Sequence, residues 1–154
     1  MNSAYFKRTT RDDRDFSALV KNLDKDLRIR NGLIMDIYDQ YNKIEAIDTV
    51  IVAYLDNEAV ACGCFKLYAA DTIEIKRMYV KPQARGMGLS KEILSKLEEW
   101  ATELGYTYSV LETGSKQTEA LSLYPKAGYK QIPKYGPYVD LPDSICFRKS
   151  LIKN

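Results

Sequence analysis

Residues 72–104 constrain the fold of this chain more than any other stretch, because a strand pattern, a glycine-containing turn and an amphipathic helix follow one another directly. Residues 72–80 are rich in β-branched and aromatic side chains, which is typical of a strand. Residues 89–104 predict a helix, since their apolar side chains recur at helical spacing: Ile93, Leu97, Trp100 and Leu104. Such a succession favours a fold in which helices cover a sheet.

The flanking segments extend this prediction to one mixed sheet with helices on both faces. Gly63 lies within the second predicted strand, where a glycine indicates a bulge or a close backbone approach. The 154 residues show no repeat or linker, so we expect a single domain over residues 1–154. Further strands are expected over residues 49–55, 59–68, 106–112 and 144–151, and helices over 12–27, 117–126 and, as a short helix or ordered loop, 33–41.

Histidine is absent, and this excludes several classes of chemistry. Ser-His-Asp and Cys-His catalysis, histidine bases and histidine-ligated metals all require an imidazole. The three cysteines, Cys62, Cys64 and Cys146, do not form an even disulfide framework. We interpret them as small buried hydrophobic residues and predict no metal site. Any enzyme of this sequence must use carboxylates, tyrosines, backbone dipoles and a cosubstrate.

Charge and hydropathy predict a cytoplasmic protein that binds neither nucleic acid nor membrane. The net charge of +2 is too small for the basic footprint of a nucleic-acid-binding protein. No apolar run approaches the roughly 20 residues that a membrane-spanning helix needs. Residues 1–8 lack the apolar segment of a signal peptide.

The turn between the strand and the helix, Gln83-Ala84-Arg85-Gly86-Met87-Gly88, has the character of a phosphate site. Glycines let the backbone approach a ligand closely, and the first N–H groups of the helix that follows form an anion site. Five cations surround the turn without an intervening acid: Lys76, Arg77, Lys81, Arg85 and Lys91. A simple tight turn and an ordinary solvated face are the alternatives. A dinucleotide fingerprint would need a third glycine where Ser90 and Lys91 stand, and the phosphate-loop lysine motif is absent.

Two motifs in this order resemble the GNAT superfamily of acyl-CoA-dependent N-acetyltransferases. Gln83, Gly86 and Gly88 match its first signature, and the run Ala120-Leu-Ser-Leu-Tyr124-Pro-Lys-Ala-Gly-Tyr129 is similar to its second motif. The resemblance covers about residues 50–151. It implies a mixed α/β fold whose central sheet has six to seven mostly antiparallel strands, flanked by about four helices.

The resemblance also implies site residues. Tyr124 matches the tyrosine beside the coenzyme sulfur, and Glu74 is a candidate base that would act through water, with a solvent-facing or ion-paired strand residue as its alternative. Gln117 replaces the family's frequent asparagine, and Pro125 is expected to distort the last helical turn. Acetyl-CoA is expected to lie against Met78, Tyr79, Val80, Gln83, Arg85, Gly86, Met87, Gly88, Leu89, Ser90 and Gln117. The acceptor is expected to contact Tyr38, Asn42, Lys43, Glu112, Tyr135 and Tyr138.

The function implied is acetyl transfer from acetyl-CoA to a primary amine of a small molecule or peptide, by direct attack in a ternary complex. The family also allows a homodimer. Two alternatives remain open, namely a non-catalytic acyl-CoA-binding regulatory module and a nucleotide-binding α/β protein that uses the same turn.

Overall fold

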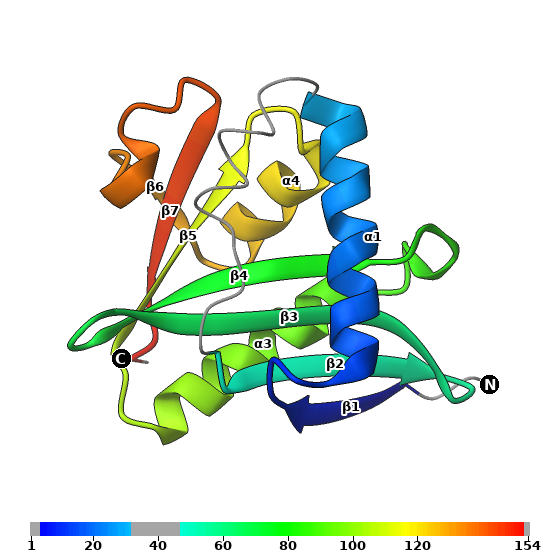
Figure 1. The fold of residues 1–154 in the computed structure, drawn as a ribbon. Coiled ribbons are helices and arrows are strands. Elements are labelled where there is room, and N and C mark those ends of the chain that lie inside the picture. Colours follow the sequence, from blue (N-terminus) through cyan, green and yellow to red (C-terminus); the bar gives the residue numbers. More distant parts are fainter. Residues whose placement is uncertain (1–3, 32–46, 153–154) are drawn as a thin grey trace.

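The computed structural model describes residues 4–31 and 47–152, with side chains for 4–26 and 47–152. One seven-stranded sheet with the order β1-β2-β3-β4-β5-β7-β6 organises them (Figure 1). Neighbouring strands are antiparallel except for the parallel pair β4–β5, which confirms the mixed, mostly antiparallel sheet. The strands are β1 (Ala4–Thr9), β2 (Thr49–Leu55), β3 (Glu58–Ala69), β4 (Thr72–Val80), β5 (Tyr108–Gly114), β6 (Lys130–Ile132) and β7 (Ser144–Ser150).

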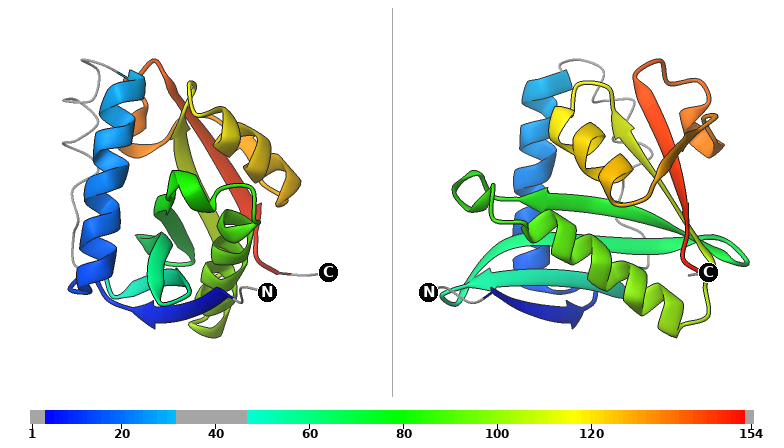
Figure 2. Two further views of the ribbon diagram at one scale, coloured as in Figure 1. Left: turned by 90° about the vertical axis from the view of Figure 1, so that its right-hand side faces the viewer. Right: turned by 180° about the vertical axis from the view of Figure 1, so that it is seen from behind.

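Three α-helices occur in the described part of the chain, and they cover both faces of the sheet. They are α1 (Arg14–Asn31), α3 (Leu89–Glu103) and α4 (Thr118–Lys126), accompanied by the 3-10 turns η2 (Pro82–Ala84) and η3 (Gly136–Tyr138). Figure 2 shows α1 on one side of the sheet, with α3 and α4 on the other. The predicted helix over 33–41 lies outside the described residues. No helix that the structure describes is long and apolar enough to cross a membrane.

Each face of the sheet has its own apolar core. On the α3 side, Ile93 and Leu97 are fully buried against the sheet. On the α1 side, Phe16 packs with Cys62 and Cys64, all fully buried. The three cysteines are free thiols, as the sequence predicted. Such closely packed layers fix the strand positions that the site depends on.

The limits of several elements differ from the prediction for local reasons. Helix α1 begins at Arg14 because Asp13 caps it, its Oδ1 accepting the Phe16 N–H at 3.0 Å. The strand expected from residue 106 begins at Tyr108, since the Tyr106 N–H bonds back to the Ala101 carbonyl at 3.0 Å.

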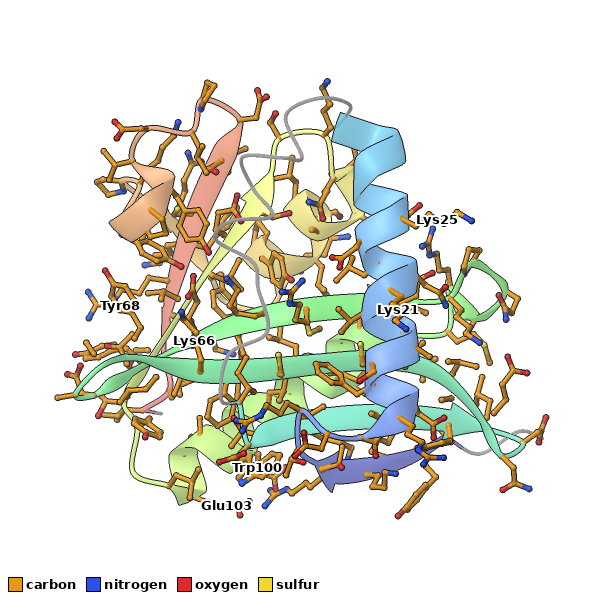
Figure 3. The ribbon with its side chains drawn as sticks, viewed as in Figure 1. Lys21, Lys25, Lys66, Tyr68, Trp100 and Glu103 are labelled. Atoms are coloured by element: carbon orange, nitrogen blue, oxygen red, sulfur yellow. The ribbon has the colours of Figure 1, made fainter. Side chains whose placement is uncertain are left out.

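The prediction missed the two edge strands, β1 and β6. Strand β1 has no contrast between apolar and polar side chains, and it is attached to α3 by a bidentate pair. The Arg8 guanidinium donates to both Glu103 carboxylate oxygens at 2.9 and 2.7 Å and lies 4.6 Å from the centroid of the Trp100 ring (the last two residues are labelled in Figure 3). Strand β6 has only three residues, too few for a periodic signal.

Gly63 lies opposite a bulge, one of the two features expected of it, and side chains approach it closely. The β3–β4 register shifts at this residue, so that Arg77 and Met78 of β4 lie between the pairs Cys64–Lys76 and Cys62–Tyr79. Arg77 adopts a left-handed conformation (φ 60°) at this bulge. A Cβ on Gly63 would meet the Met78 Sδ at 2.4 Å, so only glycine fits here without a shift of its neighbours.

Beyond Ile75, β4 and β5 separate. Their register pairs end at Ile75 with Leu111, although β4 continues to Val80 and β5 to Gly114 (Figure 1). The bulge at Arg77 lies just past this point of separation. The two strands therefore leave a V-shaped opening within the sheet.

Candidate active site

A cavity of about 300 Å³ lies at the end of β4. Strand β4, the turn after it, the first turn of α3, helix α4 and two residues of α1 contribute to its walls. Its lining residues are Leu23, Asp26, Met78, Tyr79, Val80, Ala84, Arg85, Gly86, Gly88, Leu89, Ser90, Lys91, Gln117, Glu119, Ala120, Leu123 and Tyr124.

All but two of the residues predicted to contact acetyl-CoA line this cavity. Gln83 does not, and its side-chain amide donates to Glu58 Oε2 at 3.3 Å instead. Met87 also lies outside the lining, and its side chain is 52% exposed. The structure thus brings together the residues from β4, the turn, α3 and α4 that the sequence motifs singled out.

The turn before α3 presents free backbone N–H groups to the cavity. Gly86 and Gly88 have left-handed φ angles of 82° and 79°, and a Cβ on either would find no atom within 4 Å. Gly88 is the N-cap of α3, without a side-chain cap, and the Glu92 N–H makes the first helical bond to its carbonyl. The N–H groups of Leu89, Ser90 and Lys91, which precede Glu92, therefore have no helical partner. This open, amide-lined cradle fits a diphosphate.

The five cations predicted around the turn divide in the structure. Arg85 and Lys91 line the cavity. The Arg85 Nε donates to the Val80 carbonyl at 2.9 Å, and its Nη2 lies 3.5 Å from Asp26 Oδ2. The other three do not line it: Arg77 pairs with Asp24 at 3.3 Å, Lys81 pairs with Glu58 at 3.4 Å, and Lys76 Nζ reaches the Tyr138 hydroxyl at 3.1 Å. The positive charge available to an anion is smaller than the sequence indicated.

The backbone of β4 faces the opening at alternate residues. The Lys81 N–H donates to the Val60 carbonyl of β3 at 2.8 Å. Because backbone groups along a strand alternate in direction, those of Val80 and Met78 face away from β3. That direction is toward the V-shaped opening.

Tyr124 lies in the last turn of α4 and is 6% exposed. Its ring centroid is 5.8 Å from that of Tyr129 and 6.1 Å from that of Phe147. Burial raises the pKa of Tyr124, with a further increase from the charge of Glu112, so the phenol keeps its proton. Pro125 does not end the helix, because α4 continues to Lys126, and Tyr124 still lines the cavity.

Glu74 is buried on the α1 side of the sheet, away from the cavity lining. Its Oε2 accepts hydrogen bonds from the hydroxyls of Tyr135 at 2.8 Å and Tyr138 at 3.0 Å. Tyr68, labelled near the end of β3 in Figure 3, continues this aromatic group, with its ring centroid 4.9 Å from that of Tyr135. Tyr38, Asn42 and Lys43, predicted to contact the acceptor, lie outside the described residues.

Glu112 of β5 is the second carboxylate on this face. Its Oε2 accepts a hydrogen bond from the Ser144 hydroxyl at 2.7 Å. Burial raises the pKa of Glu112 to about 7, although the Ser144 bond and the charge of Lys76 oppose the increase. The sequence analysis did not identify Ser144 or Lys76 as neighbours of Glu112, because both proximities depend on strand register and not on a local motif.

Comparison with known proteins agrees with this geometry. The sequence profile of the acetyltransferase (GNAT) family matches residues 17–129. The IAA acetyltransferase of Azospirillum brasilense is 35% identical over 105 residues, which cover 66% of this chain and 67% of that protein. An uncharacterized N-acetyltransferase of Schizosaccharomyces pombe is 28% identical over 107 residues, or 68% of this chain and 65% of that protein. The chain therefore matches about two thirds of the length of these relatives.

Solved structures give the same answer. A Klebsiella pneumoniae protein assigned to the acyl-CoA N-acyltransferases aligns with a TM-score of 0.78 at 30% identity, covering 97% of this chain and 98% of that one. The PaiA N-acetyltransferase of Thermoplasma acidophilum, solved with coenzyme A, shares the fold with a TM-score of 0.72 at 15% identity over 96% and 99% of the two chains. With the profile match over residues 17–129 and the amide-lined cavity at the strand opening, these likenesses show that the chain belongs to the GNAT family of acetyltransferases.

Proposed function

We propose that this protein transfers the acetyl group of acetyl-CoA to a primary amine of a small molecule or peptide, by direct attack in a ternary complex. The observation that carries the proposal is the single cavity that joins the free amides before α3, the open edge of β4 and the Tyr124 phenol. A diphosphate, an extended amide-containing tail and a thioester need these three features in this order.

The cradle from Gly86 to Ser90 would hold the diphosphate. Its N–H groups and the positive end of the α3 dipole stabilise an anion, and the open space at Gly86 and Gly88 admits it. The side chains of Arg85 and Lys91 add positive charge at the same wall. The diphosphate would therefore lie at the N-terminal end of α3.

The edge of β4 would hold the tail of the coenzyme. The backbone groups of Met78 and Val80 can pair with its amides as a further strand would. An N–H on this edge is also suited to stabilise the oxygen of the thioester carbonyl as negative charge develops on it. The Arg85 side chain already occupies the Val80 carbonyl, which leaves the N–H of Val80 as the donor.

Tyr124 would donate to the departing sulfur. Its raised pKa keeps the phenol protonated at neutral pH, and no described residue hydrogen-bonds its hydroxyl. The amine must lose protons to attack, and the two carboxylates of the α1 face, Glu74 and Glu112, are the candidates to receive them.

A ligand comparison tests the proposal against its rivals. Because a ligand that binds only the folded state raises the melting temperature, we expect acetyl-CoA to give a large shift and ATP and NAD none. Thiol release with a panel of primary amines then tests turnover. A larger shift with ATP or NAD would support a nucleotide-binding protein instead, and acetyl-CoA binding without turnover on any amine would support a regulatory module.

A further inference from the structure

We propose that Glu112 is the carboxylate that receives the proton of the acceptor amine, and that Glu74 positions the tyrosines beside it. This inference rests on the proposed acetyl transfer and identifies the base within it. It follows from where the two carboxylates lie relative to the strand opening and from the partners that each one already has.

Glu112 lies at the apex of the opening. The last register pair of β4 and β5 is Ile75 with Leu111, so Lys76 and Glu112 are the first residues after the strands separate. Glu74, in contrast, is paired with Val110 on one side and with Lys66 on the other. A reacting group held at the open edge of β4 is therefore reached more directly by Glu112 than by Glu74.

The hydrogen bonds of Glu74 suit a structural role. Two phenols, from Tyr135 and Tyr138, donate to the same carboxylate oxygen, and the residue is 4% exposed. One carboxylate therefore holds two tyrosines of the segment around η3. Glu74 is thus better suited to hold the η3 turn than to accept protons.

Glu112 has an unused oxygen. Ser144 donates to Oε2, whereas Oε1 has no hydrogen-bond partner among the described residues. Among the described residues, the only buried side-chain oxygen or nitrogen without a hydrogen-bond partner is Thr113 Oγ1. Because Oε1 of Glu112 also lacks a partner there, it must be accessible to solvent. A carboxylate with a pKa of about 7 is half ionised near neutral pH, which is the optimum for exchanging protons there.

The charged and titratable groups around Glu112 come from four elements. Lys76 and Glu74 face it from β4, with opposite effects on its pKa, and Ser144 donates to it from the start of β7. Tyr124 of α4, Tyr138 of η3 and Cys146 of β7 interact electrostatically with its charge, each with a raised pKa. These three neighbours keep their protons at pH 7, so Lys76 and Glu74 are the charged side chains that act on the Glu112 carboxyl.

The proposed step balances as follows. The acceptor arrives as an ammonium ion, and one of its protons passes to Glu112 and then to solvent. The free amine forms a bond to the thioester carbonyl carbon, and the C–S bond breaks. The nitrogen loses a second proton, and the sulfur takes up one proton by way of Tyr124. The products are an acetamide, a thiol and one proton released.

Three variants test the inference by the pH dependence of kcat/KM. The wild-type rate should rise with pH through about 7 as Glu112 ionises, and Glu112→Gln should lower the rate about 100-fold or more and lose this rise. Ser144→Ala removes a hydrogen bond to the ionised carboxylate, so the rise should move to higher pH. Glu74→Gln should lower stability but keep the rise. The exposed Glu99→Gln is the matched control and should match the wild type.

The outcomes separate this inference from the proposed function. Because every variant is assayed with the same acceptor amine, a difference between two pH profiles of kcat/KM is caused by the protein and not by the titration of the amine. If the wild type does not bind acetyl-CoA by calorimetry, the proposed function fails. If binding and turnover are normal and Glu112→Gln keeps its rate and pH profile, only the role of Glu112 fails.

A second measurement needs no acceptor. Carboxyl ¹³C NMR of glutamate-labelled protein follows Glu112 directly, and Glu112→Gln assigns its signal. A midpoint near 7 supports the inference. A midpoint near the ordinary glutamate value of about 4.3 overturns it.

Discussion

Gly63 leaves less space for a side chain than the glycines at positions 86, 88, 105, 128 and 136. A Cβ there would lie 2.4 Å from Met78 Sδ and 2.8 Å from Ile93 Cγ2. The lack of a side chain lets β4 bulge at Arg77 while α3 packs across β3. The missing side chain of Gly63 therefore allows both the packing of α3 and the bulge of the strand that borders the site.

We expect Gly63→Ala to lower the free energy of unfolding by about 1–3 kcal/mol, because the methyl group overpacks the contact with Ile93. Urea denaturation measures this loss. Gly136→Ala is the control, since its Cβ would find no atom within 4 Å and only the backbone conformation is affected. An equal effect of the two substitutions would contradict the packing argument.

Gly86 is the residue on which the cradle depends most directly. Gly86→Val should abolish acetyl-CoA binding in calorimetry, because the side chain would occupy the space of the diphosphate. Gly105→Val imposes a similar left-handed strain, at φ 93°, outside the cavity lining. It should lower stability but keep the affinity. Unchanged affinity in Gly86→Val would mean that this segment is only a turn.

Substitution of Tyr124 should lower turnover more than the affinity for acetyl-CoA. Tyr124→Phe removes the hydroxyl but keeps the ring contacts with Tyr129 and Phe147, so acetyl-CoA affinity should stay within about twofold while turnover falls by about tenfold or more. Steady-state thiol release and calorimetry give the two values. Equal turnover in the two proteins would remove the proposed role of the phenol.

Among the elements, strong local patterns predicted well and edge strands did not. Strands β2 and β4 have the predicted limits, and α3 differs by one residue at its end. Strand β2 is a continuous apolar run, β4 is rich in β-branched and aromatic residues, and α3 buries an apolar stripe at helical spacing. Strands β1 and β6 depend on pairing with neighbours that are distant in sequence, so the sequence offered no local signal for them.

Helix α4 tolerates a proline that the sequence analysis expected to distort it. Pro125 cannot donate to the carbonyl of Leu121, but the Ala127 N–H still bonds to the Leu123 carbonyl at 3.0 Å. The helix therefore keeps Tyr124 at the cavity.

Pro125→Ala tests whether this proline positions the tyrosine. Alanine restores the missing helical hydrogen bond, so we expect equal or higher thermal stability and unchanged acetyl-CoA affinity. Melting curves with and without the coenzyme measure both. A clear loss of affinity or turnover would show that the proline sets the direction of the Tyr124 side chain.

At the scale of the whole molecule, the sequence predicted the residues around the cavity at the end of β4 far better than the contacts on the α1 face of the sheet. The turn, the start of α3 and Tyr124 lie in the two contiguous motifs that resemble the GNAT family, so this resemblance singled them out without any knowledge of the tertiary structure. The contacts of Glu74 with Tyr135 and Tyr138, and of Glu112 with Ser144, join residues separated by 61, 64 and 32 positions. Such pairs depend on the packing of η3 and β7 against the sheet, which no local pattern specifies.

The cavity also requires distant elements to meet. Leu23 and Asp26 of α1 share its lining with Ala120 and Tyr124 of α4, although these helices lie on opposite faces of the sheet (Figure 2). They can do so because β4 and β5 separate after Ile75 and Leu111. The separation of two strands is therefore the feature of the fold that creates the site.

The measurement that tests this account most directly is a crystal structure of the protein with bound acetyl-CoA. We predict the diphosphate within hydrogen-bonding distance of the backbone N–H groups from Gly86 to Ser90, and the thioester beside the open edge of β4 at Val80. A coenzyme bound elsewhere, or a side chain of this protein occupying the cradle while the coenzyme is present, would contradict it.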